Sequence, residues 1–306
     1  MTAALGGVIP ILHTAYRNDG SLDLDAVRRE VDWVFDTGAD GCGIALASDL
    51  LRLTPEERRA LSRCVIAAAR DRGPVVMSVG AESAGAAVAY ARDALAAGAS
   101  ALMAIPPVEG TPGETEVRSY YEALLAATPL PVIVQDASAY LGRAMTPEFQ
   151  VSQFAAHGPD RILFKPEGAA VGATITRLHA LTGGRARIFE GSGGVLLVEN
   201  FRRGLAGTMP GCDLLDAIVP LWRALGRGDD DTAYRLWYPV AAIALLEGQA
   251  GLDGYLAIER YLMVKRGLFA SDRMRGAGAW TPDAPLRAEL DRLFARLRQA
   301  VSASSA

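Results

Sequence analysis

Lysine is nearly absent from this chain of 306 residues. Lysine and arginine together number 31, yet only two of these residues, Lys165 and Lys265, are lysines. The formal net charge is −4, and no block of basic residues stands out along the sequence. Proteins that bind nucleic acid or an anionic membrane surface usually carry such a block. The charge pattern therefore argues against both kinds of partner.

Long apolar runs are absent as well. Half of the residues are hydrophobic, but no uninterrupted stretch approaches the roughly 18 to 20 residues that span a bilayer. The mean hydropathy of +0.16 reflects an abundance of alanine. The N-terminal sequence MTAALGGVIPILHTAY has no basic region ahead of its apolar residues, so it does not resemble a secretory signal. We therefore expect a cytoplasmic protein with no membrane partner.

Cysteine and histidine are scarce and show no ligand spacing. The cysteines form no C-x-x-C pair, and the histidines form neither H-x-H nor H-E-x-x-H. These residues are Cys42, Cys64, Cys212, His13, His157 and His179. An odd number of cysteines without a secretory signal predicts reduced, mostly buried thiols. The spacing predicts no dedicated metal site.

Short β-branched runs alternate with longer helical stretches along most of the chain. From the second run onward they recur about every 20 to 30 residues, one βα unit each. The expected strands are 8–14, 42–47, 75–80, 101–107, 131–136, 161–167, 187–192 and 206–211. Eight consecutive βα units predict an α/β fold of the closed, parallel (β/α)8 or TIM barrel type.

An open, doubly wound parallel sheet is the alternative fold. It would need a glycine-rich phosphate loop after the first strand, where this sequence has AYRNDGS. No linker or low-complexity segment divides the chain. We expect the barrel in residues 1–226 and a C-terminal helical extension, packed on the barrel, in residues 227–306, with helices near 229–248, 253–268 and 284–301.

Lys165 ends an apolar run that begins at Ile162. In such a barrel the reactive groups stand at the carboxyl ends of the strands, and the sixth strand ends here. A poorly solvated position disfavours the ammonium and makes the free amine available to attack a carbonyl, as Schiff-base catalysis requires. The alternative is a lysine whose stem covers apolar surface while its charge reaches water. Lys265, in the helical stretch ERYLMVKRG, is expected to be a solvated helix residue.

The chain resembles the dihydrodipicolinate synthase and N-acetylneuraminate lyase family of Schiff-base-forming barrels over nearly its whole length. The likeness rests on GVIPILHTAYRNDGSLD, on ILFKPEG at the sixth strand and on GLAGTMPG at the eighth. The segments IVQDA (133–137) and ALASDLLRLT (45–54) are closer to the 2-keto-3-deoxy-L-arabinonate dehydratase branch. The resemblance implies a small 2-keto acid as substrate, Lys165 as the Schiff-base lysine, no metal or organic cofactor, and a homotetramer or dimer.

The sequence departs from the family pattern at three strand ends. Where the synthases and neuraminate lyases have a Gly-Thr-Thr-Gly-Glu type of loop, residues 45–49 read Ala-Leu-Ala-Ser-Asp. Gln135 stands where a family tyrosine shuttles protons, and Pro106-Pro107 replace the tyrosine pair after the fourth strand. Since a family aldolase needs that tyrosine as the base on the C4 hydroxyl, these departures favour another reaction.

We expect this reaction to be the dehydration of a 2-keto-3-deoxy sugar acid. An iminium on Lys165 acidifies the C3 protons, and the enamine that results can expel the C4 hydroxyl as water. One alternative is a pyruvate-dependent aldolase or synthase with Gln135 and Tyr140 in an altered proton relay. Another is a barrel that has lost catalysis and serves as a binding subunit, although retention of Lys165 argues against it.

Dehydration requires a base near C3 and an acid near C4. The candidates by strand-end position are Glu190, Glu167, Asp49 and Asp136. Glu167 faces the same side as Lys165 if the strand continues past Pro166, and a loop salt bridge is the alternative. Asp136 is at least as well explained as a side chain that binds a loop amide.

We expect three catalytic and six substrate-binding residues. The catalytic residues are Lys165, Gln135 and Glu190, and the substrate-binding residues are Ala47, Ser48, Asp49, His13, Glu167 and Met209. Ser48 and the neighbouring amides would replace the family's donors to the keto-acid carboxylate. His13 is either a proton shuttle or sugar-hydroxyl ligand, or a histidine packed beneath the loops. The Gly-Ser-Gly-Gly at 191–194 is typical of a tight βα loop, with an anion site as the alternative.

Overall fold

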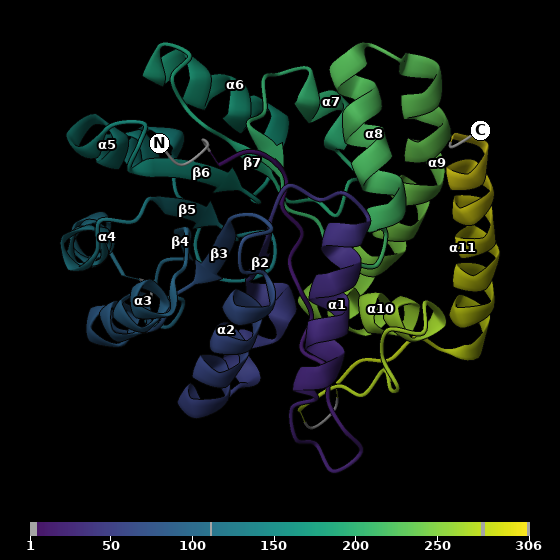
Figure 1. The fold of residues 1–306 in the computed structure, drawn as a ribbon. Helices are drawn as coiled ribbons and strands as arrows, with labels where there is room; N and C mark the ends of the chain where they lie inside the picture. Colours follow the sequence, from purple (N-terminus) through teal and green to yellow (C-terminus); the bar gives the residue numbers. More distant parts are fainter. Residues whose placement is uncertain (1–4, 111, 277–278, 305–306) are drawn as a thin grey trace.

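The computed structural model describes residues 5–110, 112–276 and 279–304 of the chain. Within these residues, eight parallel strands form a barrel surrounded by helices (Figure 1). The strands are β1 (Gly7–Val8), β2 (Cys42–Ile44), β3 (Val75–Ser78), β4 (Ala101–Ala104), β5 (Val132–Asp136), β6 (Ile162–Pro166), β7 (Phe189–Glu190) and β8 (Gly207–Thr208). The prediction of a (β/α)8 barrel is confirmed.

Hydrogen bonds join the strands in two groups, β2-β3-β4-β5-β6 and β1-β8-β7. Single bridges close the two gaps, since Ile11 pairs with Gly43 of β2 and Phe164 of β6 pairs with Ile188. β1 is shorter than the expected 8–14. The ladder is interrupted at Pro10, which has no N–H to donate, although the Pro10 carbonyl still accepts from the Gly43 N–H at 3.0 Å.

Alternation along the strands separates the inside of the barrel from its outside. On β6, Leu163 belongs to the apolar cluster within the barrel, together with Ile133 of β5, whereas Phe164 packs outward against the helices. Lys165 comes next, so its side chain returns to the inside. The register pairs Gln135 of β5 with Lys165 of β6, which places the two side chains next to each other at the carboxyl end of the barrel.

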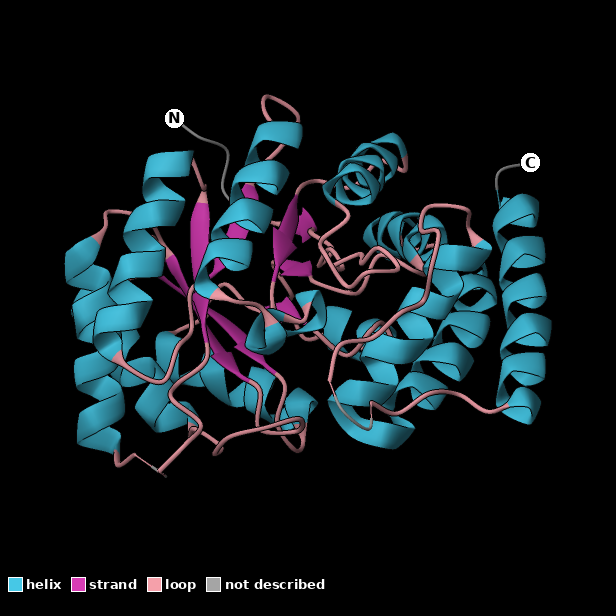
Figure 2. Ribbon diagram, turned by 90° about the horizontal axis from the view of Figure 1, so that it is seen from below, coloured by secondary structure: helices cyan, strands magenta, loops and turns pink. Residues whose placement is uncertain are grey.

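Helices cover the outside of the barrel. They are α1 (Leu24–Asp36), α2 (Pro55–Ala68), α3 (Ala84–Ala97), α4 (Glu114–Ala127), α5 (Pro147–His157), α6 (Val171–Thr182), α7 (Leu197–Phe201) and α8 (Leu215–Arg227). Figure 2 shows the helices, in cyan, around the magenta strands. In the described part of the chain, none of the helices combines the length and the apolar character that crossing a bilayer requires.

Three further helices form the C-terminal extension: α9 (Asp230–Glu247), α10 (Gly251–Lys265) and α11 (Ala284–Ser304). α9 lies between α8 and α11 at one edge of the molecule (Figure 1). One apolar cluster includes Val8 of β1, Leu236 of α9 and Leu290 of α11, so the extension and the barrel share a core. The division of the chain at residue 226 therefore stays a prediction. α10 packs against a single 3-10 turn, η1 (Leu46–Ser48), after β2, and this contact brings α10 to the mouth of the barrel.

Candidate active site

A small cavity of about 50 Å³ lies at the carboxyl end of the barrel, and Lys165 forms part of its wall. The remaining wall comes from the end of β5, from the segments that follow β1, β2, β5, β6, β7 and β8, and from α10. Lys165 is only 3% exposed, because it faces inward from a strand that is buried along its whole length. The strand-end amine expected from the sequence therefore stands in a poorly solvated site beside an empty space.

Glu167 and Gln135 surround the amine of Lys165. The Glu167 N–H donates to the Asp136 carbonyl at 2.7 Å, so the chain stays paired with β5 beyond Pro166. Glu167 consequently faces the same side as Lys165, with its Oε1 3.1 Å from the lysine Nζ. Gln135 donates from Nε2 to the other carboxylate oxygen of Glu167 at 2.5 Å. The three side chains form one buried group in which Glu167 is within reach of a proton on the lysine.

The side-chain oxygen of Gln135 is buried and has no hydrogen-bond partner among the described residues. An ionised carboxylate only accepts hydrogen bonds, so the amide nitrogen must point to Glu167 and the oxygen away from it. A buried, unpaired oxygen costs free energy, which a hydroxyl donor from a ligand would recover. Gln135 therefore offers an acceptor to a ligand but, unlike tyrosine, exchanges no proton.

Glu190 ends β7 and is fully buried, but it is not among the described residues that line the cavity. Its carboxyl group accepts from the Ser192 N–H at 2.6 Å and from the Thr208 hydroxyl at 2.9 Å. Burial raises the pKa of Glu190 above its ordinary value. The next residue, Gly191, does line the cavity, and a Cβ there would lie 2.5 Å from Cε of Lys165. Glycine at this position thus allows the turn to approach the lysine.

In the loop after β2, Ala47 lines the cavity together with Ala45 and Leu46. Ser48 is fully buried beneath them. Its hydroxyl donates to the Leu12 carbonyl and accepts from the Ala45 N–H at 3.1 Å. The hydroxyl thus holds the loop in shape, and it could donate to a substrate only if its bond to the Leu12 carbonyl broke.

Asp49 lies behind the same loop, 2% exposed and in the left-handed backbone region with a φ of 59°. The Tyr16 hydroxyl donates to Oδ2 and the Arg52 guanidinium to Oδ1, each at 2.9 Å. The Arg260 guanidinium of α10 lies 3.5 Å from Oδ2. With these partners Asp49 connects the loop to α10, and it is not among the described residues of the cavity wall.

Tyr140, four residues after β5, lines the cavity, as does Met209 after β8. The Tyr140 ring packs edge-on against the ring of Tyr255 from α10, with centroids 5.6 Å apart. Burial, and then the nearby Glu167 carboxylate, raises the pKa of Tyr140 well above its ordinary value. Its hydroxyl therefore keeps its proton at neutral pH.

His13 is completely buried and is not among the described residues that line the cavity. Its Nδ1 lies 2.7 Å from Glu30 Oε1, and its Nε2 lies 2.9 Å from Glu259 Oε2. Burial lowers the pKa of His13, but the two carboxylates outweigh this effect and raise the pKa to about 10. His13 is therefore an imidazolium at neutral pH with both N–H groups engaged. A contact with substrate would require one of these ion pairs to break.

His13 also belongs to two groups of side chains whose ligand atoms lie within 4.8 Å of one another. One group adds Glu30 and Cys212, and the other adds Asp213 and Glu259. The spacing in the sequence did not indicate them, because the residues come from distant elements. In both groups a carboxylate already occupies a nitrogen of His13, so a metal ion would have to displace an ion pair.

Sequence reasoning missed the contribution of α10 to the cavity. Leu252, Tyr255 and Glu259 of this helix line it, although they lie far beyond Lys165 along the chain. One signal was available in the sequence. Glu259 and Arg260 interrupt the apolar stretch LAIERYLM, and both are buried in the structure. Charged residues are rarely fully buried unless they are paired, so a charged pair within an apolar run indicates a buried polar site.

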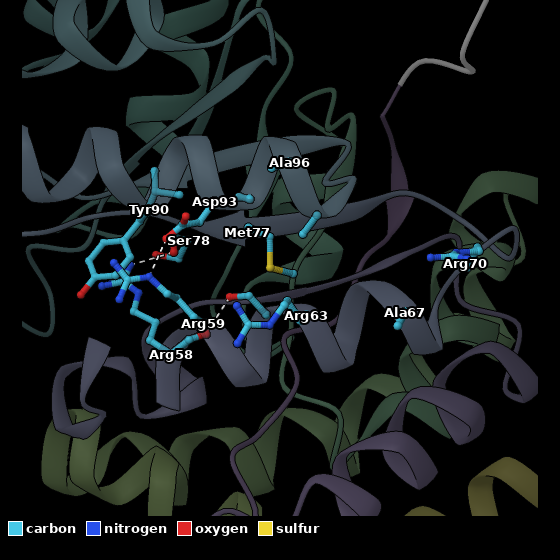
Figure 3. Close-up of a pocket in the computed structure, with 14 residues that line it drawn as sticks. Arg58, Arg59, Arg63, Ala67, Arg70, Met77, Ser78, Tyr90, Asp93 and Ala96 are labelled. Atoms are coloured by element: carbon cyan, nitrogen blue, oxygen red, sulfur yellow. Dashed lines mark hydrogen bonds and ion pairs between the residues drawn. The ribbon is translucent and has the colours of Figure 1, made fainter. Parts of the chain in front are cut away.

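A larger cavity, of about 410 Å³, lies on the outside of the barrel between α2 and α3 (Figure 3). Two of the four arginines in its wall are engaged by the fold. Arg58 donates to the carbonyls of Ser78 and Gly80 at 2.8 and 3.0 Å, and Arg59 pairs with Asp93 at 2.6 Å. These contacts connect α2 to β3 and α3. The reactive site is therefore identified by its chemistry and not by the size of the cavity.

A buried lysine beside a carboxylate at the carboxyl end of a barrel strand defines a Schiff-base enzyme of the TIM-barrel class. Comparison with protein families agrees, since residues 4–213 match the dihydrodipicolinate synthetase family. The chain belongs to this family, and it is a lyase of the class that works through a lysine Schiff base. The family resemblance inferred from sequence segments is confirmed.

Two enzymes and one crystal structure illustrate what this chain is similar to. The chain is 30% identical over 278 residues to the L-2-keto-3-deoxyarabonate dehydratase of Azospirillum brasilense, covering 88% of this chain and 87% of that protein. It is 41% identical over 125 residues to the probable 5-dehydro-4-deoxyglucarate dehydratase 1 of Streptomyces coelicolor, covering 40% and 38%. The crystal structure of dihydrodipicolinate synthase from Rhodopseudomonas palustris matches with a TM-score of 0.87 and 25% identity, covering 97% of this chain and 99% of that one.

Proposed function

We propose that this lyase removes water from a 2-keto-3-deoxy sugar acid through an iminium on Lys165. The observation that carries the proposal is the position of Glu167, whose Oε1 lies 3.1 Å from the lysine Nζ. C3 of the substrate is bonded to the iminium carbon, so a carboxylate beside Nζ is within reach of the C3 protons. The 30% sequence identity to an L-2-keto-3-deoxyarabonate dehydratase, over 88% of this chain, supports the same reaction.

The proposed steps sum to the loss of one water. Nζ of Lys165 attacks the C2 carbonyl carbon, and the carbonyl oxygen leaves as water to give the iminium. Glu167 takes a proton from C3, and the electron pair of that C–H bond moves toward the iminium nitrogen to give an enamine. The enamine expels the C4 hydroxyl, which leaves as water with a proton from Tyr140. Loss of a C5 proton and protonation at C3 then move the double bond to C4–C5, and this enol tautomerises to an aldehyde by protonation at C4. Hydrolysis of the imine consumes one water and frees Lys165, so a pentonate would end as an oxo-acid semialdehyde.

The other expected site residues have supporting roles in this proposal. Ala47 belongs to a helical turn whose first N–H groups have no partner within the turn, which suits the C1 carboxylate of the substrate. Gln135 offers its side-chain oxygen to a substrate hydroxyl, and Met209 supplies apolar wall. We assign the role of C3 base to Glu167 and not to Glu190, whose carboxyl group is engaged between β7 and β8.

An aldolase remains the second candidate, because Tyr140 lines the cavity, although its hydroxyl would first have to lose its proton to act as the base on the C4 hydroxyl. Incubation with a 2-keto-3-deoxypentonate separates the two reactions. Dehydration yields the semialdehyde, whereas cleavage between C3 and C4 yields pyruvate and glycolaldehyde. We expect the semialdehyde alone.

Reduction with borohydride tests the covalent step. The mass of the wild-type protein should increase by the mass of one attached and reduced keto acid, either the substrate or pyruvate. The mass of Lys165→Ala should not increase. If neither pyruvate nor the pentonate adds mass to the wild type, the Schiff-base reaction is excluded for these acids.

We also propose that the protein assembles as a dimer or tetramer. Tyr238 and Leu245 of α9 are 63% and 65% exposed, and the Tyr238 ring packs against the rings of Tyr234 and Trp237. Grouped exposed apolar side chains mark contact surfaces between proteins. Light scattering should give a molar mass that is a multiple of 32.3 kDa, the mass of one chain. Tyr238→Glu should lower this molar mass. A wild-type mass of one chain would contradict this proposal.

A further inference from the structure

We infer that Glu259 of α10 selects the far end of the substrate, accepting a hydrogen bond from a hydroxyl and excluding a second carboxylate. The inference rests on the proposed function, because it concerns the same Lys165 cavity. It narrows the substrate class to keto-deoxy acids that carry a single carboxylate.

Glu259 reaches the cavity beside the segment that follows β8. There, a Cβ on Gly211 would lie 2.5 Å from Glu259 Oε1, so only glycine leaves room for the carboxylate. Both residues line the cavity. Glu259 Oε2 is paired with His13 at 2.9 Å, while no described residue donates a hydrogen bond to Oε1. One oxygen is therefore held by the protein, and the other is available to a ligand.

The His13 imidazolium fixes the direction of this carboxylate. Its opposite nitrogen lies 2.7 Å from Glu30, so the ring cannot turn without losing an ion pair. Glu259 itself is 3% exposed. A buried acceptor whose orientation is set before the ligand arrives binds a hydroxyl without the cost of ordering a side chain.

The position of Glu259 suits the end of the substrate that is distant from the iminium. Lys165 lies at the end of β6, whereas Gly211 follows β8 and His13 follows β1. β1 lies opposite β5 in an eight-stranded barrel, so His13 stands across the mouth from Gln135, while Gly211, after β8, stands two strands away from Lys165 on β6. A chain attached to Lys165 that extends across the cavity meets α10.

The charges of the cavity wall also disfavour a substrate with a second carboxylate. In the described part of the cavity wall, the ionisable acids and bases other than tyrosine are Lys165, Glu167 and Glu259. The C1 carboxylate of any 2-keto acid already adds one negative charge. A second carboxylate at the far end would face Glu259 where little water screens the repulsion, and such a clash is an effective means of rejecting a ligand. An arabonate ends in a hydroxyl and a glucarate in a second carboxylate, so Glu259 favours the first type.

Two keto acids of equal length test this selection without any dehydration. Neither 5-hydroxy-2-oxopentanoate nor 2-oxoglutarate has a C4 hydroxyl to lose, so borohydride trapping reports their binding to Lys165 alone. We expect half-maximal trapping of the hydroxy acid at a concentration at least about tenfold lower than that of 2-oxoglutarate, as like charges disfavour the wrong partner. Glu259→Gln should remove most of this preference, and Glu259→Asp, which keeps the charge, should retain it.

Glu122→Gln is the matched control. It removes the carboxylate partner of another histidine, His157, and Glu122 is not among the described residues that line the cavity, so the preference should stay unchanged. The inference is overturned if the wild type traps both acids equally, a result that needs no variant to fold. It is also overturned if Glu259→Gln keeps the wild-type preference, or if Glu122→Gln changes the preference as much as Glu259→Gln does. Absence of trapping even with pyruvate would overturn the Schiff-base proposal, and this inference with it.

Discussion

Two buried nitrogen bases follow strands of this barrel, Lys165 at the end of β6 and His13 after β1. They are 3% and 0% exposed, and glutamate carboxylates accompany both. Lys165 has one such partner, Glu167 at 3.1 Å, and it lines a cavity. His13 has a carboxylate on each ring nitrogen and lies outside the described cavity wall.

If Lys165 is the nucleophile, as we propose, this difference indicates that a strand-end position and burial are not sufficient for reactivity. A nucleophile needs one direction left open to the substrate and a nearby group that accepts its proton. Lys165 has both in the cavity and in Glu167. The two N–H groups of His13 are used within the protein, so the ring serves to hold Glu30 and Glu259 in place.

Replacement of Lys165 should give the largest effect. Lys165→Ala removes the nucleophile and should lower kcat by at least about 10⁴-fold, with loss of the borohydride adduct. Lys265→Ala is the matched control, because Lys265 is the other lysine of the chain and pairs with Asp291 at 2.7 Å near the surface. It should leave kcat unchanged. Equal losses of kcat in the two variants would contradict the assignment of Lys165 as the nucleophile.

Replacement of Glu167 should separate covalent binding from proton transfer. Glu167→Gln keeps the shape of the side chain but cannot take a C3 proton, so kcat should fall by about 10³-fold while the borohydride adduct still forms. Exchange of the C3 protons of pyruvate with deuterated solvent, followed by NMR, measures the step directly and should be lost.

Glu190→Gln provides the contrast to this variant, since Glu190 is buried without lining the described cavity. It should retain most of the exchange. Exchange that persists in Glu167→Gln and disappears in Glu190→Gln would transfer the role of base to Glu190.

Loss of the Tyr140 hydroxyl should have a smaller effect. Tyr140→Phe removes the acid proposed for the C4 hydroxyl, so dehydration should slow by about 10²-fold while deuterium exchange at C3 of pyruvate continues. Tyr120→Phe is the control, because the Tyr120 hydroxyl accepts from the Ala81 N–H at 3.1 Å and does not line the described cavity. A Tyr140→Phe variant with unchanged dehydration would exclude this hydroxyl as the acid.

The smallest expected effect is the contribution of His13 to the stability of the fold. Its pKa in the folded protein, about 10, lies above the ordinary value of 6.5. The fold therefore binds this proton more tightly than the unfolded chain does. This contribution is complete below about pH 6.5 and is lost as the pH rises toward 10. Denaturant titrations should show the free energy of unfolding falling across this window, by at most about 1.4 kcal/mol per pH unit from this group.

Variants isolate the His13 contribution from other titrating groups, among them Asp213, whose pKa burial raises to about 6. His13→Gln should flatten the slope between pH 6.5 and 10. His157→Gln, which removes a histidine whose side chain is 28% exposed, should leave the slope as it is. An unchanged slope in His13→Gln would show that the two ion pairs of His13 do not hold its proton.

The barrel and the inward direction of Lys165 could be predicted because they depend on local patterns. Strand residues alternate between two faces, so Lys165, two residues after the inward Leu163, points into the barrel. The same rule predicted Glu167 on the side of Lys165. The register of β5 and β6 then brought Gln135 to the same place, as two adjacent strand ends in one barrel would suggest.

The loop residues were harder to predict. Ser48 and Asp49 have the chemistry of substrate ligands, yet their side chains bind Leu12, Tyr16 and Arg52. A polar side chain in a loop binds whichever donor or acceptor the fold brings nearest, and backbone groups often compete successfully with a ligand. Their predicted contact with the substrate stays a prediction.

By itself, the sequence determined the order of the eight βα units and the strand end at which the amine of Lys165 faces the barrel interior. Only the tertiary structure decided which carboxylates meet which cation, and that α10 forms part of the cavity wall through Tyr255 and Glu259. The physical reason is the range of the two effects. Side-chain direction along a strand follows from the covalent geometry of a few neighbouring residues, whereas ion pairs and cavity walls require distant segments to pack together.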